Sequence, residues 1–581
     1  MTKEEVADAL EEIATLLEVK GENPFRANAY RNGARAVLQM SGDLGEIVRG
    51  GKLAGVPGIG ETLRDKITAL VETGELPFLT ELRQSIPAGV VQMLRIPGLG
   101  PKKAKALQDA GITSLEQLKE ACESGTVAAM KGFGAKTATK ILEGLAFLGQ
   151  VGNRVRIDQA LSVGTALLDA VRAMPGVVRA ELAGSLRRRR ETVGDIDIIA
   201  SSPKPAPIME TFVKLPNVQQ IIGKGETKSS IVVQQHVDGE RVTLNADLRV
   251  VSDKEFPFTL VYFTGNKNLN IKMRQRAIDR GLRLNEYELA GDGKTIKCKD
   301  EAEVFAALDL DWIPPEMRED TGEVELASRT DHKSAGRLPK LVEVEDVRGV
   351  FHNHTIASDG KNTLEEMALA AKKLGLEYLG IADHSQSLNI ANGLSPQRVR
   401  KQQQEIDELN SRLKGIRLLK GTECDILEDG SLDFSDDVLA TFDYVVASVH
   451  TIFGQPVDVM TDRIVRAVRH PKVTMLGHAT GRLLLRRDGY KVNLDKVLDA
   501  AAEAGTMVEI NAQPLRLDLD WVYCKRAKTL GIPLVINPDA HHTSELEYYK
   551  YGVNVARRGW LEAKDVFNTR TLKQVLAHLK K

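Results

Sequence analysis

The 581-residue sequence is poor in cysteine, in aromatic residues and in long apolar runs. It has four cysteines and no CxxC pair, which argues against a disulfide framework and fits a reducing compartment. No run of 18 apolar residues occurs, and the charged segment Met1–Val6 lacks the apolar core of a signal peptide. We therefore expect a cytoplasmic protein that has no membrane partner.

Net charge is also nearly absent. Lys and Arg total 79 against 80 Asp and Glu, which gives −1 at pH 7. This balance excludes a globally basic, nucleic-acid-coating protein, so any such affinity must come from local patches and backbone donors. A hydrophobic content of 42% is typical of globular proteins, and the length predicts three or more domains.

The first 150 residues read as mostly helical, interrupted by three similar turns, each with two glycines. The pairs are Gly58 and Gly60, Gly98 and Gly100, and Gly132 and Gly134. Each pair precedes a helix that carries Lys or Arg. Paired glycines allow close backbone approach, and the N–H groups at a helix start favour a phosphate. One such turn is more often simple helix punctuation, but three together indicate sequence-independent contact with a DNA backbone.

Three aspartates are expected to converge on one sheet face. The apolar run 196–200 predicts a buried strand, and alternation places Asp195 and Asp197 on the same side. Asp247 lies in a second strand-like run, 242–251. Acids on a solvated face are the alternative, but oxygen ligands grouped in this way suit Mg²⁺ or Mn²⁺ bound with substrate phosphates. The preceding Gly184 and Ser185 and the nearby Arg188 offer contacts to a triphosphate.

These residues resemble a known signature. Gly184-Ser185, nine residues, then Asp195-Ile196-Asp197 matches the nucleotidyltransferase superfamily, and Tyr262–Gly265, Asn270 and Arg283–Tyr287 resemble the turn and thumb of family X DNA polymerases. The resemblance implies that Asp195, Asp197 and Asp247 hold two ions and that Ser185 and Arg188 position a triphosphate. It also implies that Tyr262 and Phe263 flank the sugar of the nucleotide. By the same resemblance, Gly265 forms the tight turn and Asn270 reaches the base edge. Asn245 departs from the family, because many relatives carry a basic residue there.

The same resemblance raises a further role for Lys66. It lies eight residues after Gly58, where some family X enzymes place a lyase lysine that forms a Schiff base with a cleaved abasic sugar. Thr62 occupies a position where such relatives often carry a second lysine. A lysine that simply contacts a phosphate is the open alternative.

The C-terminal region alternates short apolar strands with helices, which predicts a barrel-like α/β domain whose site lies just past the strand ends. Ligand-type residues occupy those ends: His352, His354, Asp359, His384, Glu423, His450, His478, Asp539 and His541. Mixed imidazole and carboxylate ligands point to two or three Zn²⁺, Mn²⁺ or Fe²⁺ ions. A cluster of this kind suits phosphoester hydrolysis.

These nine positions resemble the polymerase-and-histidinol-phosphatase (PHP) domain. The resemblance implies one ion held by His352, His354, Glu423 and Asp539, a second by Glu423, His450 and His478, and a third by Asp359, His384 and His541. Val350 departs from the family, which often has Asp there. Together the two patterns resemble bacterial family X DNA polymerases.

The predicted fold is a multidomain α/β chain. The expected parts are a lyase-like helical domain (1–82), fingers (83–150), a nucleotidyltransferase-type α+β palm (151–260), a thumb (261–318), a linker (319–345) and a distorted (β/α) barrel PHP domain (346–581). The resemblance implies a monomeric repair polymerase that fills gaps in primer-template DNA from dNTPs, with a 3′→5′ exonuclease, abasic-site nuclease or 3′-phosphatase in the barrel. Two alternatives stay open: a phosphoesterase whose front half only binds DNA, and a non-catalytic DNA-end scaffold.

Overall fold

The structure, a computed structural model, describes residues 3–40, 44–56, 58–74, 76–94, 96, 99–151, 154–330 and 337–580. The chain divides into two compact units. The first comprises residues 1–154 with 216–220 and 232–244, and the second comprises 155–215, 221–231 and 245–581. Within the described ranges no helix combines the length and the apolar character needed to cross a membrane.

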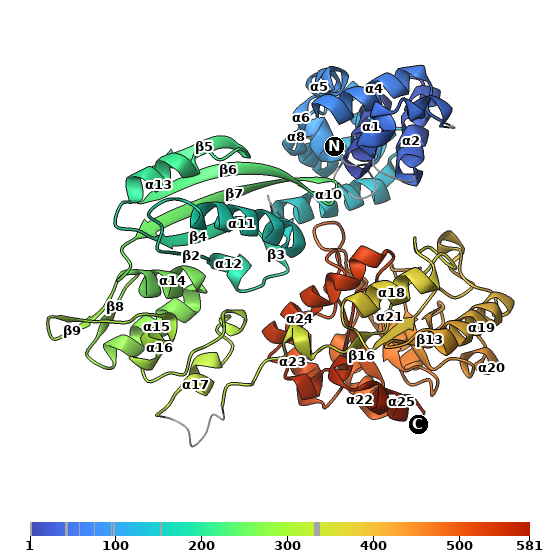
Figure 1. Ribbon diagram of the computed structural model, residues 1–581. Coiled ribbons are helices and arrows are strands. Elements are labelled where there is room, and N and C mark those ends of the chain that lie inside the picture. The colour runs from blue at the N-terminus through green and yellow to red at the C-terminus, as the bar shows by residue number, and fades with distance from the viewer. Residues whose placement is uncertain are drawn as a thin grey trace. The chain divides into compact units, whose positions relative to one another are not determined.

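The N-terminal part of the chain is helical, as predicted (Figure 1). Leu10, Ile13 and Leu17 recur at the spacing of one helix face and are buried in its core, together with Ile67. The helices are α1 (Lys3–Lys20), α2 (Pro24–Gln39), α3 (Leu44–Arg49), α4 (Glu61–Thr73), α5 (Pro77–Gln84), α6 (Ala88–Met93), α7 (Pro101–Asp109), α8 (Leu115–Glu123), α9 (Thr126–Ala129) and α10 (Gly134–Val151).

A five-stranded sheet follows, in the order β2-β4-β7-β6-β5. The predicted strands are both present, and β4 runs parallel to β7 with Asp197 paired to Asp247. Helices α11 (Ile157–Arg172), α12 (Gly184–Arg187) and α13 (Pro205–Phe212) accompany the sheet. The strands are β2 (Arg179–Leu182), β4 (Asp195–Ser201), β5 (Val218–Lys224), β6 (Lys228–Val237) and β7 (Glu240–Val251), and β1 (Val155–Arg156) pairs with β3 (Thr192–Val193).

The next part packs helices around its own core, in which Leu269, Met273 and Phe305 are buried. The segment expected to be an irregular linker contains helix α17, and Glu323 within it is fully buried. Its carboxylate accepts the backbone N–H groups of Asp320 and Thr321, so local hydrogen bonds satisfy the buried charge. The elements are α14 (Phe256–Thr264), α15 (Lys267–Ile278), β8 (Arg283–Leu284), β9 (Leu289–Gly291), β10 (Lys294–Ile296), α16 (Glu301–Ala306) and α17 (Glu323–Ala327).

The C-terminal part is a parallel barrel, coloured yellow to red in Figure 1. Its strands lie in chain order: β11 (Gly349–Val350), β12 (Tyr378–Ile381), β13 (Arg417–Asp425), β14 (Tyr444–Ser448), β15 (Met475–Leu476), β16 (Met507–Asn511) and β17 (Leu534–Asn537). A parallel bridge between Asn353 and Ala540 joins the first strand region to the last. The strands are almost entirely buried, as expected of a parallel sheet covered by helices.

Helices alternate with these strands, and this alternation is the βα rhythm predicted from the sequence. They are α18 (Leu364–Lys373), α19 (Pro396–Arg412), α20 (Asp436–Leu439), α21 (Val457–Val468), α22 (Leu494–Ala504), α23 (Trp521–Thr529), α24 (Tyr549–Arg558) and α25 (Leu572–Leu579). Each βα connection carries the chain back over the barrel, so the residues that follow the strands gather at one rim.

Candidate active sites

The three aspartates lie side by side on the five-stranded sheet. Asp195 and Asp197 project from β4 on one face, and Asp247 is the direct neighbour of Asp197 on β7. Burial raises the pKa of Asp197 to about 7, and the charges of Asp195 and Asp247 add to this effect. Lys228 partly offsets the negative charge, since its Nζ lies 2.7 Å from Asp247 Oδ2. Crowded carboxylates of this kind form a hard-oxygen site that suits a divalent cation.

Gly184 is the residue that fits against this cluster. Its φ is +62°, and a Cβ at this position would stand 2.2 Å from Asp197 Oδ2. Any side chain here would therefore displace a carboxylate of the cluster. The Gly-Ser step predicted from the sequence is thus a close backbone approach to the acids.

A cavity of about 360 Å³ opens beside the cluster and collects most of the expected nucleotide contacts. Its lining comprises Gly184, Ser185, Arg188, Asp195, Asp197, Tyr262, Phe263, Gly265, Asn266, Lys267, Asn270 and Arg274. The Tyr262 and Phe263 rings meet edge to face, with centroids 5.2 Å apart. Asn266, Lys267 and Arg274 were not singled out from the sequence, although two of them add positive charge that suits a phosphate.

Two of the expected contact residues already have protein partners. Arg188 donates from Nη1 to the Thr264 carbonyl at 2.6 Å and from Nε to Glu319 at 3.2 Å. Asn270 donates from Nδ2 to the Tyr262 carbonyl at 2.7 Å, which ties it to the aromatic pair. Both side chains are therefore held in place before any ligand arrives.

In the N-terminal part, each glycine turn leads directly into a helix. Gly60 and Gly100 precede α4 and α7 without a side-chain cap, which leaves the first N–H groups of those helices available. Gly58, Gly132 and Gly134 have φ values of +89°, +89° and +70°. Gly98 lies outside the described residues.

Lys66 faces an aromatic pair rather than an acid. Its Nζ lies 3.3 Å from the Phe78 ring centroid and 5.4 Å from that of Tyr30. The two rings stack with centroids 6.3 Å apart. A ring face attracts a cation, so this placement holds a positive charge on α4.

All nine ligand-type residues of the barrel come together at one rim. Successive strands or the loops after them supply the side chains, and Glu423 stands at the centre. Its Oε1 lies 2.9 Å from His478 Nε2 and 3.2 Å from His450 Nε2. Its Oε2 lies 3.2 Å from His352 Nε2 and 3.0 Å from His384 Nδ1. Burial alone would raise the pKa of Glu423, but the surrounding histidines hold that pKa well below its usual value.

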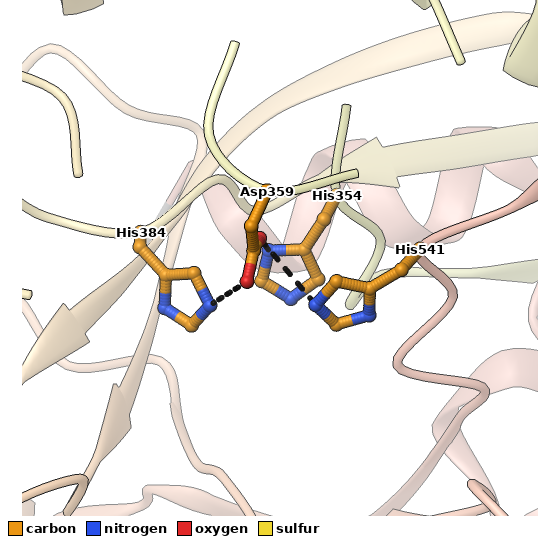
Figure 2. Close-up of side chains that lie close together, drawn as sticks. All are labelled: His354, Asp359, His384 and His541. Carbon is orange, nitrogen blue, oxygen red and sulfur yellow. Dashed lines mark ion pairs between the residues drawn. The ribbon is translucent and has the colours of Figure 1, made fainter. Parts of the chain in front are cut away.

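Asp359 organises the outer part of this cluster, as Figure 2 shows. Its two oxygens lie 3.4 Å from His541 Nε2 and 3.5 Å from His384 Nε2. His354 joins this group as well as the group of His352 and Asp539, whereas the sequence placed it with one ion only. His384 likewise stands with Glu423 and His450 in a further group. The groups thus overlap at His354 and His384, in addition to the sharing of Glu423 that the resemblance implies.

The donor set fits divalent ions. Several buried ring nitrogens make no well-aligned hydrogen bond among the described residues, although three of them lie 3.0 to 3.2 Å from a carboxylate oxygen: Nε2 of His352, both nitrogens of His354, Nδ1 of His384 and Nδ1 of His478. An unpaired buried nitrogen is costly, and an ion within the groups would satisfy such lone pairs. Imidazole and carboxylate ligands together suit Mn²⁺, Zn²⁺ or Fe²⁺.

Sequence reasoning missed the buried acids that hold the histidines. Glu509 accepts from the His478 backbone N–H and lies 2.7 Å from His352 Nδ1, while Asp425 contacts His450 Nδ1. Asp383 holds the loop that carries Asp359, because it accepts from Thr355. A signal for Glu509 existed: an acid inside an apolar strand is rarely buried without a partner.

Four segments of the chain match known protein families. Residues 1–76 match a helix-hairpin-helix domain and 90–146 match a SAM-like helix-hairpin-helix tandem. Residues 259–319 match the DNA polymerase beta thumb, and 351–513 match the PHP domain.

Individual relatives cover the chain to different extents. The DNA polymerase/3'-5' exonuclease PolX of Bacillus subtilis (strain 168) is 40% identical over 584 residues, which span 100% of both chains. A protein named probable phosphatase from Thermoanaerobacter sp. (strain X514) is 28% identical over 229 residues, 38% of this chain and 89% of its own. DNA polymerase lambda of Rattus norvegicus is 24% identical over 340 residues, 54% of this chain and 56% of its own. Full-length similarity, the thumb and the PHP barrel together place this chain in the family X DNA polymerases that carry a PHP domain.

Proposed function

We propose that this protein extends primer strands across short DNA gaps and removes nucleotides from 3′ ends, each at its own site. The observation that carries the proposal is the presence of two separate carboxylate-rich clusters in one chain. One lies beside a cavity lined with cationic and aromatic side chains, and the other fills the rim of the barrel. The name of the Bacillus subtilis relative, which pairs a polymerase with a 3'-5' exonuclease, supports this assignment.

At the first site, Asp195, Asp197 and Asp247 would hold Mg²⁺ or Mn²⁺. Bound ions of this kind supply charge neutralisation for an in-line phosphoryl displacement. Arg188 and Ser185 would contact the triphosphate from the cavity wall. The rings of Tyr262 and Phe263 would limit the space around the sugar, and Asn270, anchored on the Tyr262 carbonyl, would face the base.

At the second site, the nine barrel residues would hold two or three divalent ions, with Glu423 between them. Bound ions supply Lewis-acid activation of water and of the scissile phosphate. The protein's own part is to fix the ligands: Glu509 sets the orientation of His352, and Asp425 that of His450. Abasic-site cleavage and 3′-phosphate removal would use the same chemistry.

The N-terminal glycine turns would hold the DNA backbone, through the uncapped starts of α4 and α7 and through α10. This contact reads no sequence, which suits a protein that acts on gaps wherever they arise. The near-zero net charge is compatible with it, because the donors are backbone N–H groups and local lysines.

The direct test is incubation of the purified protein with labelled gapped DNA, with and without dNTPs, in Mg²⁺ or Mn²⁺. Extension should require dNTPs, and shortening of the 3′ end should dominate without them. A chain that shortens DNA but never extends it, under conditions in which it remains folded, would reduce the proposal to a phosphoesterase with a DNA-binding front half.

A further inference from the structure

One carboxylate, Glu319, joins the nucleotide cavity to the barrel. Its Oε1 accepts from Arg188 Nε at 3.2 Å and from Arg558 Nη2 at 3.4 Å. Its Oε2 accepts from Asn266 Nδ2 at 3.4 Å. Arg188 and Asn266 line the cavity beside the aspartates, whereas Arg558 belongs to α24 of the barrel. The same acid thus holds two cavity residues and one barrel residue.

Arg558 is built into this position. Its side chain is only 1% exposed, and its Nη1 lies 2.5 Å from Glu191 Oε2. Glu191 is four residues before Asp195 in the sequence, and Glu319 holds Arg188 and Asn266 of the cavity wall. The Arg558 guanidinium also lies over the Trp521 ring, at 4.9 Å from its centroid. A buried guanidinium needs paired acids, and here both of them come from the polymerase part of the chain.

The residues next to Arg558 also pack against the polymerase part of the chain. Trp560, two residues after Arg558, packs against the apolar core that holds Met317 and Val324. The neighbouring Arg557 donates from Nε to Glu316 at 2.9 Å. The segments on both sides belong to one compact unit. Trp and Arg side chains of this kind are typical anchors of an interface.

Glu319 Oε1 is shared by Arg188 and Arg558, and Arg190 Nη1 lies 4.0 Å from Oε2. This sharing has an electrostatic consequence. If Arg188 were its only partner, the carboxylate would offset most of the guanidinium charge that faces the cavity. Arg558 competes for the same Oε1 and leaves more of that charge for an incoming anion. It also fixes the carboxylate, on which Arg188 and Asn266 both depend for their orientation.

We propose that Arg558 is a positioning residue of the polymerase site, through which the barrel sets the affinity of the cavity for the nucleotide triphosphate. The inference rests on the proposed nucleotide cavity and adds a role for a residue that touches neither DNA nor the metal ligands. On this view the barrel is a structural part of the polymerase, besides carrying its own chemistry.

The test is single-nucleotide incorporation on gapped DNA by the full chain, with KM for the dNTP and kcat measured separately. Arg558→Gln should raise KM by about fivefold or more, the scale of a modest coupling between sites, while kcat changes much less. In the Glu319→Gln background, Arg558→Gln should cause no further change in KM, because Arg558 acts on the cavity through the Glu319 carboxylate. Arg558→Lys, which keeps the charge, should recover part of the loss.

Arg557→Gln is the matched control, since Arg557 sits in the same contact but pairs with Glu316 and not with Glu319. Its KM should stay at the wild-type value, and hydrolysis of DNA ends should be unchanged in every variant. An unaltered KM in folded Arg558→Gln, or an equal rise in Arg557→Gln, would overturn the proposal. If Arg558→Gln does not fold, Arg558→Lys decides the matter by the same criterion, with a smaller rise in KM. An unaltered KM in Arg188→Gln would instead contradict the nucleotide cavity itself.

Discussion

Glu423 Oε1 lies 2.9 Å from His478 Nε2, while the other oxygen of the same carboxylate lies 3.2 Å from His352 Nε2. Each oxygen therefore faces its own pair of histidines: His478 and His450 at Oε1, and His352 and His384 at Oε2. Such an arrangement would allow Glu423 to be shared between two ions. Asp359, by contrast, serves only the outer group, with His384, His541 and His354.

Glu423→Ala should cost more bound metal than Asp359→Ala, because it removes a ligand from two ions at once. We expect loss of hydrolysis at DNA ends with nucleotide incorporation retained. Elemental analysis of the purified variants, alongside the nuclease rate, measures both effects. Unchanged metal content and nuclease rate in Glu423→Ala would show that the cluster has been misread.

Glu509→Gln should weaken metal binding at the barrel without removing any ligand. The substitution keeps the shape but loses the charge that orients His352, and the loss of such a partner typically costs about 10- to 100-fold in affinity. Titration of the variant with metal, followed by calorimetry, measures this change in affinity. Glu503→Gln, at an exposed acid on α22 that pairs with Arg469, is the control and should match the wild type. If Glu509→Gln binds metal as tightly as the wild type does, Glu509 does not orient His352 for metal binding.

Replacing Tyr262 and Phe263 together with Ala should relax the choice of sugar. Both rings line the cavity and pack edge to face, so their removal opens space beside the nucleotide. We expect the ratio of deoxyribonucleotide to ribonucleotide kcat/KM to fall by about tenfold or more, the scale of a lost steric contact. If the ratio does not move, selection lies in the backbone or elsewhere.

Lys66 should act through its charge rather than as a nucleophile. A Schiff base requires Nζ to reach the sugar aldehyde, whereas Nζ lies 3.3 Å from the Phe78 ring centroid, against the ring face. Borohydride treatment with a 5′-deoxyribose-phosphate substrate should trap no adduct that depends on Lys66, while Lys66→Ala should weaken DNA binding. A trapped adduct that disappears in Lys66→Ala would restore the lyase assignment.

Much of this arrangement could be predicted from local patterns. Continuous apolar runs predicted β4 and the barrel strands, because a buried parallel strand needs such a run, whereas β7 was predicted from alternating apolar and polar residues. Strand alternation then placed Asp195 and Asp197 on one face, and the strand ends brought the nine barrel ligands together.

The rest depends on contacts that local patterns do not encode. Arg188 and Glu319 are 131 residues apart, and nothing near either residue signals the other. The segment around Glu323 was expected to be a linker because it has few large apolar residues, and the backbone N–H groups that stabilise its buried carboxylate cannot be recognised in the sequence. The proximity of His354 to Asp359 as well as to Asp539 was not predicted either, since it depends on loop geometry.

Asp197→Ala distinguishes two independent active sites in one chain from a single shared site. On labelled gapped DNA with Mn²⁺, we expect nucleotide incorporation to fall by more than the roughly 10- to 100-fold loss caused by removing a residue that only orients a metal ligand. Hydrolysis of the 3′ end should persist at the wild-type rate. Glu423→Ala, run beside it, should give the reverse pattern. Equal loss of both activities in folded Asp197→Ala would contradict the two-site account.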